Sequence, residues 1–182
     1  MNKARIAVLY DWMDKWGGVE RVLLTIHSLF PQAVFYTSYL DPVEAAWAKD
    51  LQIKTSFIQK LPNFVKKNRQ LTLLFYPYAF ESLDLNSFDV VLSLTSSFSK
   101  AVITKPGVKH ICYLLTPPRF LWSHVESYVK NPVMRFLTLP FVNSLREWDR
   151  ISARRPDEIY SISNTVSKRC LLYYGLSSKV IY

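Results

Sequence analysis

Seven short apolar runs, each rich in β-branched or aromatic residues, alternate with helical stretches along this chain of 182 residues. The apolar runs occupy residues 6–10, 33–39, 52–57, 89–94, 109–115, 158–162 and 179–182. Helical spacing is found in residues 19–30, 42–49, 65–80, 132–154 and 165–174. Pro140 is expected to kink or break the fourth helical stretch, giving a helix pair that covers the core and has a basic outer face. Such alternation predicts a mostly parallel sheet covered by helices on both faces.

The predicted fold class is therefore α/β, with a Rossmann-like, doubly wound, mostly parallel sheet of about seven strands. The length fits a single domain over residues 1–182, and a hydrophobic content of 49% supplies a continuous core.

In parallel sheets, ligands bind in the crevice at the carboxyl ends of the strands. Small polar residues, glycines and one arginine follow four of the predicted strands, at residues 11–18, 95–97, 116–119 and 163–164. We interpret this edge as a binding site for polyhydroxyl and phosphate groups. Taken singly, Ser96, Ser97 or the pair Asn164 and Thr165 could instead be helix N-caps, each contributing about 1 kcal/mol without any ligand.

Gly17 and Gly18 lie between the first apolar run and the first helical stretch. Free backbone N–H groups at a helix N-terminus can bind an anion, so this turn is a candidate phosphate site. The alternative is that glycine permits a turn with positive φ and has no ligand. The spacing lacks the three glycines of a dinucleotide-binding fingerprint, which disfavours a nicotinamide enzyme.

The charge is strongly positive, since 23 Lys and Arg residues against 14 Asp and Glu residues give a formal net charge of +9. Residues 51–80 contain no acidic residue, and basic and aromatic side chains are interleaved there. This composition predicts a patch that contacts an anionic membrane surface. The patch residues are Lys60, Lys66, Lys67 and Arg69. A solvated helix face is the alternative, and nucleic acid is not expected as a partner because no recognisable binding module accompanies the charge.

Cys112 and Cys170 are too few for a disulfide framework or a metal cluster, and we expect both to be buried. No metal site is expected. The first apolar run is too short for a signal peptide, and no run of about 18 apolar residues is present to span a membrane. The expected location is cytoplasmic, either free or peripheral at the inner face of the cytoplasmic membrane.

Four stretches resemble the N-terminal domain of GT-B fold glycosyltransferases of the large retaining family 4, the "glycosyl transferases group 1" set. In the order of that family they are GGVERV at residues 17–22, SSFSKAV at 96–102, ICYLLTPPRFLW at 111–122 and DEIYSISNT at 157–165. The third stretch is the most specific, because it is close to the family's Tyr-x-His-Thr-Pro-x-Arg-aromatic-x-Trp segment.

The resemblance implies a two-domain enzyme whose N-terminal half binds the acceptor, a glycan or lipid-linked saccharide. The C-terminal half, expected to be absent from these 182 residues, would bind most of the nucleoside-diphosphate sugar. The isolated chain is accordingly expected to be inactive, and to need no cofactor and no metal. The resemblance assigns the donor diphosphate to Gly17 and Gly18. It assigns the acceptor to Ser96, Ser97, Thr116, Arg119, Trp122 and Asn164, although Trp122 could merely pack.

One position departs from the family pattern. Leu115 stands where relatives have a histidine before Thr-Pro, and leucine has no titratable or hydrogen-bonding group to replace it. His110 and His124 are near in sequence but do not occupy the motif position, so the catalytic residue stays unknown. The alternative function is a non-catalytic module of Rossmann-like fold that binds an anion or a protein partner.

Overall fold

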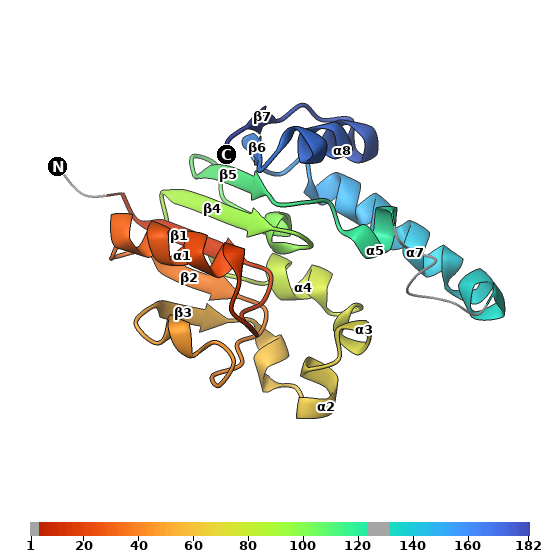
Figure 1. Ribbon diagram of the computed structural model, residues 1–182, viewed down its shortest axis with the longest axis horizontal. Helices are drawn as coiled ribbons and strands as arrows, with labels where there is room; N and C mark the ends of the chain where they lie inside the picture. Colours follow the sequence, from red (N-terminus) through yellow and green to blue (C-terminus); the bar gives the residue numbers. More distant parts are fainter. Residues whose placement is uncertain (1–3, 124–131) are drawn as a thin grey trace.

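A computed structural model describes residues 4–123 and 132–182, and it contains one seven-stranded sheet whose strands are all parallel (Figure 1). The order across the sheet is β3-β2-β1-β4-β5-β6-β7. The strands are β1 (Ile6–Tyr10), β2 (Val34–Thr37), β3 (Gln52–Thr55), β4 (Val90–Thr95), β5 (Lys109–Leu114), β6 (Glu158–Ser161) and β7 (Lys179–Val180). Each lies within, or within one residue of, a predicted apolar run, and the predicted fold class is confirmed.

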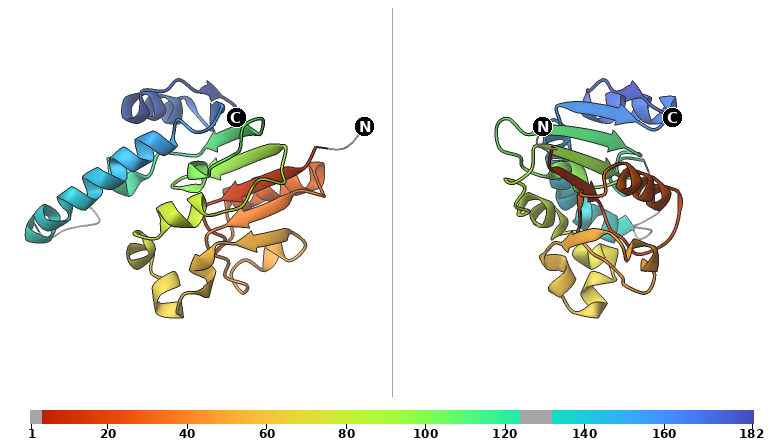
Figure 2. Two further views of the ribbon diagram at one scale, coloured as in Figure 1. Left: turned by 180° about the vertical axis from the view of Figure 1, so that it is seen from behind. Right: turned by 90° about the vertical axis from the view of Figure 1, so that its left-hand side faces the viewer.

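Helices cover both faces of the sheet (Figure 2). They are α1 (Gly18–Leu29), α2 (Asn63–Lys66), α3 (Arg69–Thr72), α4 (Tyr76–Glu81), α5 (Arg119–Trp122), α7 (Pro132–Ser152) and α8 (Asn164–Tyr174). Short 3₁₀ turns are η1 (Ala46–Ala48), η2 (Phe57–Lys60) and η3 (Ser99–Ala101). Because successive strand residues point to opposite faces, Val8 packs with Leu23 of α1, whereas Ala7 and Leu9 pack with Phe80 of α4 and Leu145 of α7.

The face of β4, β5 and β6 on the α1 side has less helical cover than the opposite face. An apolar groove of about 460 Å³ lies there, lined by Val22, Ile26, Leu92, Leu94, Ile111, Tyr113, Tyr160, Ile181 and Tyr182. Right-handed crossovers explain this asymmetry, because strands added in opposite directions from the centre of a sheet place their helices on opposite faces.

The prediction of one helix over residues 65–80 is wrong, because the chain forms three short helices there, α2, α3 and α4. Asn68 accepts a hydrogen bond from the Leu71 N–H through its side chain, and the Thr72 hydroxyl donates to the Asn68 carbonyl. These side chains compete with the regular helical pattern. Pro77 lies in the first turn of α4, where a residue without an N–H is tolerated at the start of a helix.

Two further helix predictions need correction. Of residues 42–49, only the 3₁₀ turn η1 is helical, because the Asp41 carboxylate binds the Val43 and Glu44 N–H groups and forms a turn there. The break expected at Pro140 is absent: α7 continues through it as one helix instead of a pair. Its apolar residues Phe141 and Leu145 pack against the core beyond the proline.

Cys112 of β5 and Cys170 of α8 are buried and free, as predicted. Burial raises the pKa of the Cys112 thiol to about 12, so this group stays protonated at neutral pH.

His110 of β5 is a buried titratable group, 1% exposed, whose Nε2 lies 2.9 Å from the Ser93 hydroxyl. Burial lowers the pKa of this imidazole to about 4, which outweighs the opposing effect of Asp157. The unfolded chain, with an ordinary histidine pKa near 6.5, therefore binds more protons than the folded chain between about pH 4 and pH 6.5.

We expect the free energy of unfolding to fall by up to about 3 kcal/mol as the pH drops from 6.5 to 4 through this one group. Urea unfolding at several pH values would measure it. His110→Gln keeps a polar group near Ser93 and should flatten this part of the profile. A variant profile as steep as that of the unchanged chain would contradict the assignment.

Candidate functional site

The carboxyl ends of the central strands leave the sheet at one edge. Tyr10 of β1 is paired with Leu94 of β4, Leu94 with Tyr113 of β5, and Tyr113 with Tyr160 of β6. This continuous row of four neighbours places the segments after β1, β4, β5 and β6 along the same edge (Figure 1). The four polar segments singled out in the sequence are thereby brought together at one edge of the sheet.

Asp11, the first residue after β1, joins two of these segments. Its carboxylate is fully buried and accepts hydrogen bonds from the N–H groups of Ser96, Phe98 and Ser99 at 2.7–2.8 Å. The hydroxyls of Thr95 and Ser96 donate to it at 3.1 and 3.2 Å. A buried carboxylate requires such donors, so Asp11 fixes the path of the chain after β4.

Ser96 and Ser97 are therefore not helix caps. The turn η3 follows Phe98 and has no side-chain cap. The Ser96 hydroxyl binds Asp11, and Ser97 is 3% exposed with its carbonyl accepting a 2.6 Å hydrogen bond from the Lys100 ammonium.

Gly17 is the N-cap residue of α1, and Gly18 is the first residue of that helix. No side chain caps the helix at Gly17. Neither glycine has a positive φ, so a left-handed turn is not the reason for glycine here. A Cβ at Gly17 would lie 3.0 Å from Oε2 of Glu20, a buried carboxylate that accepts a hydrogen bond from the Tyr10 hydroxyl. Glu20 thus already places a negative charge at this helix N-terminus, where the helix dipole favours one.

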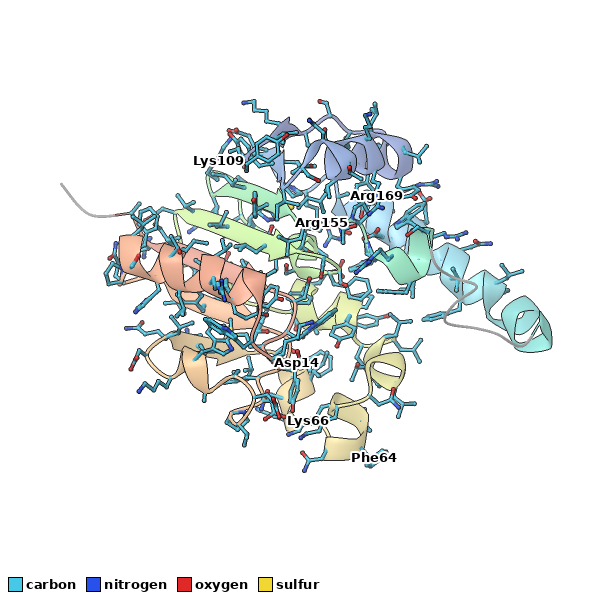
Figure 3. All side chains as sticks on the ribbon, in the orientation of Figure 1. Asp14, Phe64, Lys66, Lys109, Arg155 and Arg169 are labelled. Carbon is cyan, nitrogen blue, oxygen red and sulfur yellow. The ribbon has the colours of Figure 1, made fainter. Side chains whose placement is uncertain are left out.

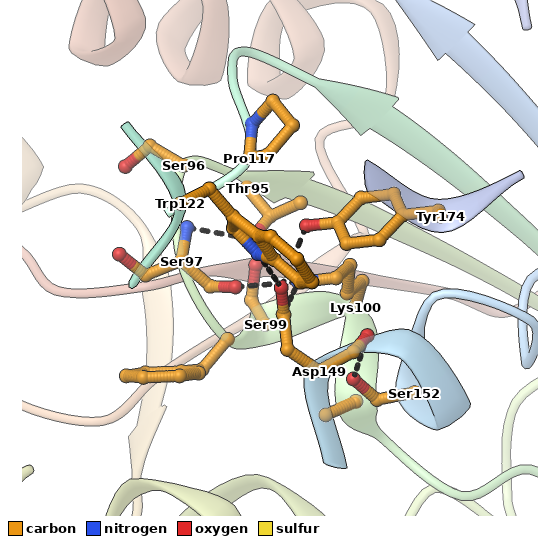
Figure 4. A network of polar contacts seen from close by, with 12 residues as sticks. Thr95, Ser96, Ser97, Ser99, Lys100, Pro117, Trp122, Asp149, Ser152 and Tyr174 are labelled. Atoms are coloured by element: carbon orange, nitrogen blue, oxygen red, sulfur yellow. Dashed lines mark hydrogen bonds and ion pairs between the residues drawn. The ribbon is translucent and has the colours of Figure 1, made fainter. Parts of the chain in front are cut away.

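A buried ion pair lies beneath the segment after β4 (Figure 4). The Lys100 ammonium is 2.6 Å from Oδ1 of Asp149 in α7, with side-chain exposures of 2% and 0%. The other carboxylate oxygen accepts hydrogen bonds from the Trp122 indole at 2.7 Å and the Tyr174 hydroxyl at 2.9 Å. Burial, followed by the charge of Asp149, raises the pKa of Tyr174, so its hydroxyl remains a donor. This network connects η3, α5, α7 and α8.

Trp122 is surrounded by groups of the protein itself. Its ring stacks on Tyr173 with centroids 5.0 Å apart, and the guanidinium carbons of Arg150 and Arg146 lie 5.0 and 5.7 Å from its centroid. These contacts give Trp122 a structural role in packing. They also show that Arg146 and Arg150 are not simply a solvated outer face of α7, since both additionally donate to backbone carbonyls.

The segment after β5 begins with Leu115, which packs against the core cluster on the α1 face. The Thr116 hydroxyl donates to the Pro117 carbonyl at 3.1 Å and lies 3.5 Å from an Arg169 nitrogen. Pro117 and Pro118 are buried and hold the start of α5, whose first residue, Arg119, is exposed. An exposed guanidinium on a fixed turn can make bidentate contact with phosphate or carboxylate.

Asn164 is exposed at the start of α8 and donates a 3.1 Å hydrogen bond to the Tyr182 hydroxyl. The N-cap of that helix is Ser163, whose hydroxyl accepts from the Val166 N–H, so Asn164 is not a cap.

The lysines of the basic segment 51–80 differ in their surroundings. Lys60 is exposed, whereas Lys66 donates to the Gln59 carbonyl at 3.2 Å and Lys67 pairs with Asp41 at 3.1 Å. Arg69 begins α3, and its side chain lies outside the described residues, as does His124. Exposed apolar side chains occur in the same segment: Phe64, Leu71, Leu74 and Tyr78, at 74%, 47%, 55% and 67%.

A cavity of about 180 Å³ lies next to β1 and β2 at the same edge, and sequence reasoning did not find it. Its walls come from the segments after β1 and β2 and from α2 and α4. The lining residues are Trp12, Asp14, Tyr39, Asp41, Lys66, Lys67 and Tyr76. The available signal was the repeated pairing of an aromatic with an aspartate two residues later, at 12 and 14 and again at 39 and 41.

The Asp41 carboxylate in this cavity is well supplied with donors. Hydrogen bonding to Lys67 lowers its pKa to about 2, and Tyr39 and two backbone N–H groups act in the same direction. Tyr39 lies beside it, and burial raises the pKa of its hydroxyl to about 12. At neutral pH the carboxylate is ionised and the phenol is protonated.

Among residues 4–123 and 132–182, no three His, Cys, Asp or Glu side chains are grouped as a metal site would require. Over the same part of the chain, no helix is both long and apolar enough to cross a membrane.

Comparison with known proteins gives little. No family model matches the sequence, and no curated protein matches it. Among solved structures, the chain is similar to one titled "Crystal structure of UDP-N-acetylglucosamine 2-epimerase", with a TM-score of 0.45 and 9% identity. The match covers 98% of this chain and 47% of that one, so the chain spans about half its length. A likeness of this degree carries no information about activity.

The Lys100–Asp149 pair yields a stability prediction. Removing one partner of a buried pair leaves an uncompensated charge, so Lys100→Met and Asp149→Asn should each lower the free energy of unfolding by about 3 kcal/mol. The double variant should lose less than the sum of the two. Lys109→Met, which breaks an exposed pair with Glu158, is the matched control and should change it by less than about 1 kcal/mol. Urea unfolding measures all four, and equal effects at Lys100 and Lys109 would contradict the prediction.

Proposed function

We propose that this chain is the acceptor-binding half of a retaining glycosyltransferase of GT-B fold, related to family 4. In this proposal a second domain, outside these 182 residues, binds most of a nucleoside-diphosphate sugar. The enzyme transfers the sugar to a glycan or lipid-linked acceptor held at the carboxyl edge of the sheet.

The observation that carries the proposal is the convergence of the motif stretches. The four stretches that resemble the family are far apart in sequence, yet three of them include the segment directly after β4, β5 or β6, and the first begins at Gly17, where α1 starts after β1. In open parallel sheets this edge is where ligands bind, which supports a shared site rather than four unrelated similarities.

The roles within the site follow from its chemistry. Gly17 and Gly18 offer backbone N–H groups to the donor diphosphate, with the Glu20 carboxylate as a neighbour that the phosphate must accommodate. Arg119 and Thr116 are accessible to the acceptor, whereas Ser96, Ser97 and Trp122 are bound into the structure that supports it. Asn164, exposed at the start of α8, completes the acceptor side.

A non-catalytic module is the second candidate, and Leu115 favours it. The leucine packs against the core where the family has a histidine, so this position offers no proton-transfer group. The module would use the same edge to bind an anion or a protein partner, without turnover.

A transferase assay of the full-length parent protein with a panel of sugar nucleotides separates the two. We expect transfer by the full-length protein and none by the 182-residue chain alone. Arg119→Ala should lower kcat/KM for the acceptor by about tenfold or more, because a fixed guanidinium contact is lost. Arg154→Ala, at another exposed arginine, is the control. Absence of transfer with every donor would favour the module.

We also propose that the segment 51–80 binds an anionic membrane surface through its exposed lysines, such as Lys60, and its exposed apolar residues, since Lys66 and Lys67 are bound within the protein. Phe64→Ser combined with Leu74→Ser should reduce sedimentation with anionic vesicles several-fold, because these side chains are 74% and 55% exposed. Leu172→Ser, at a residue also 74% exposed but on α8, should leave it unchanged. Equal sedimentation with neutral and anionic vesicles, insensitive to salt, would contradict the proposal.

A further inference from the structure

The cavity beside β1 and β2 owes its walls to a short extension of the sheet. Beyond the strand ends, Met13 forms a parallel bridge with Leu40: its N–H donates to the Tyr39 carbonyl at 2.8 Å, and its own carbonyl accepts from Asp41 at 2.8 Å. Met13 and Leu40 pack into the core on the α1 face. Since side chains alternate along an extended chain, their neighbours project to the opposite face.

These neighbours are two aromatic residues and two aspartates, which all line the cavity: Trp12, Asp14, Tyr39 and Asp41. The Tyr39 hydroxyl donates to the Asp41 carboxylate at 3.0 Å. The opposite wall is α2, which is held close by Gln59. The amide of Gln59 accepts from the Leu40 N–H at 2.8 Å and donates to the Leu40 carbonyl at 3.0 Å. The Lys66 ammonium then donates to the Gln59 carbonyl. The cavity is therefore bounded by hydrogen-bonded backbone rather than by free loops.

Charged side chains of both signs line the cavity. Among the lining residues that the structure describes, two lysines, Lys66 and Lys67, face two aspartates, Asp14 and Asp41, a formal sum of zero. Figure 3 labels Asp14, in the segment after β1, and Lys66 of α2, which both line this cavity. A dianionic phosphate gains no net attraction from this set. A polyhydroxyl ligand does, because each hydroxyl can donate to a carboxylate and accept from an ammonium.

Donor capacity and aromatic surface are both present. An ammonium has three N–H donors, and Lys66 uses one of them on Gln59. Trp12, which is half-buried and packs on the buried Tyr76 with ring centroids 5.8 Å apart, gives the cavity apolar surface against which the C–H side of a sugar ring can pack. The volume of about 180 Å³ is below the 300–1,000 Å³ typical of drug-sized ligands, which limits the occupant to about one ring.

We propose that this cavity is a saccharide subsite that binds one uncharged pyranose ring, with Asp14 and Lys66 as its hydrogen-bonding residues and Trp12 as its stacking surface. The inference rests on the proposed function in one respect: the ring belongs to the acceptor. It adds a subsite away from the four motif stretches, on the β2 side of the edge.

The test is a two-dimensional NMR titration of the 182-residue chain with the methyl glycosides of glucose, galactose, mannose and N-acetylglucosamine, and separately with inorganic phosphate. At least one glycoside should give saturable shifts of the Trp12 indole N–H and of the Met13 and Leu40 amides, with a millimolar Kd. Asp14→Asn and Lys66→Gln should each weaken binding at least about fivefold. Lys60→Gln, an exposed lysine of the same basic segment outside the cavity, is the matched control and should bind as the unchanged chain does.

Three results would overturn the subsite: no saturable shift with any glycoside, saturation by phosphate alone, or unchanged binding by the Asp14 and Lys66 variants with folded spectra. The proposed function is tested separately, by the transferase assay of the full-length parent. Glycoside binding in the cavity without transfer by the full-length parent removes the enzyme but keeps the subsite. Transfer without glycoside binding in the cavity does the reverse.

Discussion

The buried carboxylate of Asp11 is the interaction on which the arrangement of this edge depends. An ionised group without solvent needs several donors, and Asp11 obtains five from residues 84–88 positions away in the sequence. Three of these are backbone N–H groups, so the chain after β4 must turn around the carboxylate whatever its side chains are. The end of β1 and the segment after β4 are thereby locked together at the centre of the sheet.

That turn has consequences further along the chain. It directs Lys100 into the interior, where the ammonium meets the Ser97 carbonyl and the Asp149 carboxylate. Asp149 in turn orients Trp122 and Tyr174, so a second buried aspartate secures α5 and α8 to α7. Asp41 has a similar structural role after β2, where its carboxylate accepts hydrogen bonds from Tyr39 and two backbone N–H groups and pairs with Lys67. Three aspartates, two in the segments after β1 and β2 and one in α7, therefore organise segments that hydrophobic packing alone would leave without a defined path.

The contrast between hydrophobic packing and these buried polar contacts explains which features could be predicted from the sequence. The strands were predictable because apolar runs with strand composition are a local signal, and α1 and α8 were predictable for the corresponding helical reason. The breaks within residues 65–80 depend on side-chain hydrogen bonds at Asn68 and Thr72 that compete with helical ones, and hydrophobic periodicity does not report such competition.

The same limit applies to the candidate site. Its proposed location at the carboxyl edge follows from the topology of a parallel sheet, but the role of Asp11 could not be predicted, because its donors are supplied by a turn that forms around it. The cavity depended on the Met13–Leu40 bridge, a pairing between residues 27 positions apart that no local pattern specifies. Gly17 is a smaller example. The sequence indicates a glycine turn at this position, but the structural feature that favours glycine is the close approach of the Glu20 carboxylate and not a positive φ.

The short helix α2 shows how one turn of chain can serve two surfaces. Successive residues of an α-helix are rotated by about 100°, so Phe64 and Lys66 project about 200° apart. Phe64 is 74% exposed at the outer side, whereas Lys66 lines the cavity. The positive charge of the segment is likewise divided, because Lys67 is paired with Asp41 while Lys60 is exposed. Net charge alone therefore overstates the basic character of this segment, and membrane contact and ring binding should respond to different substitutions within the same four residues.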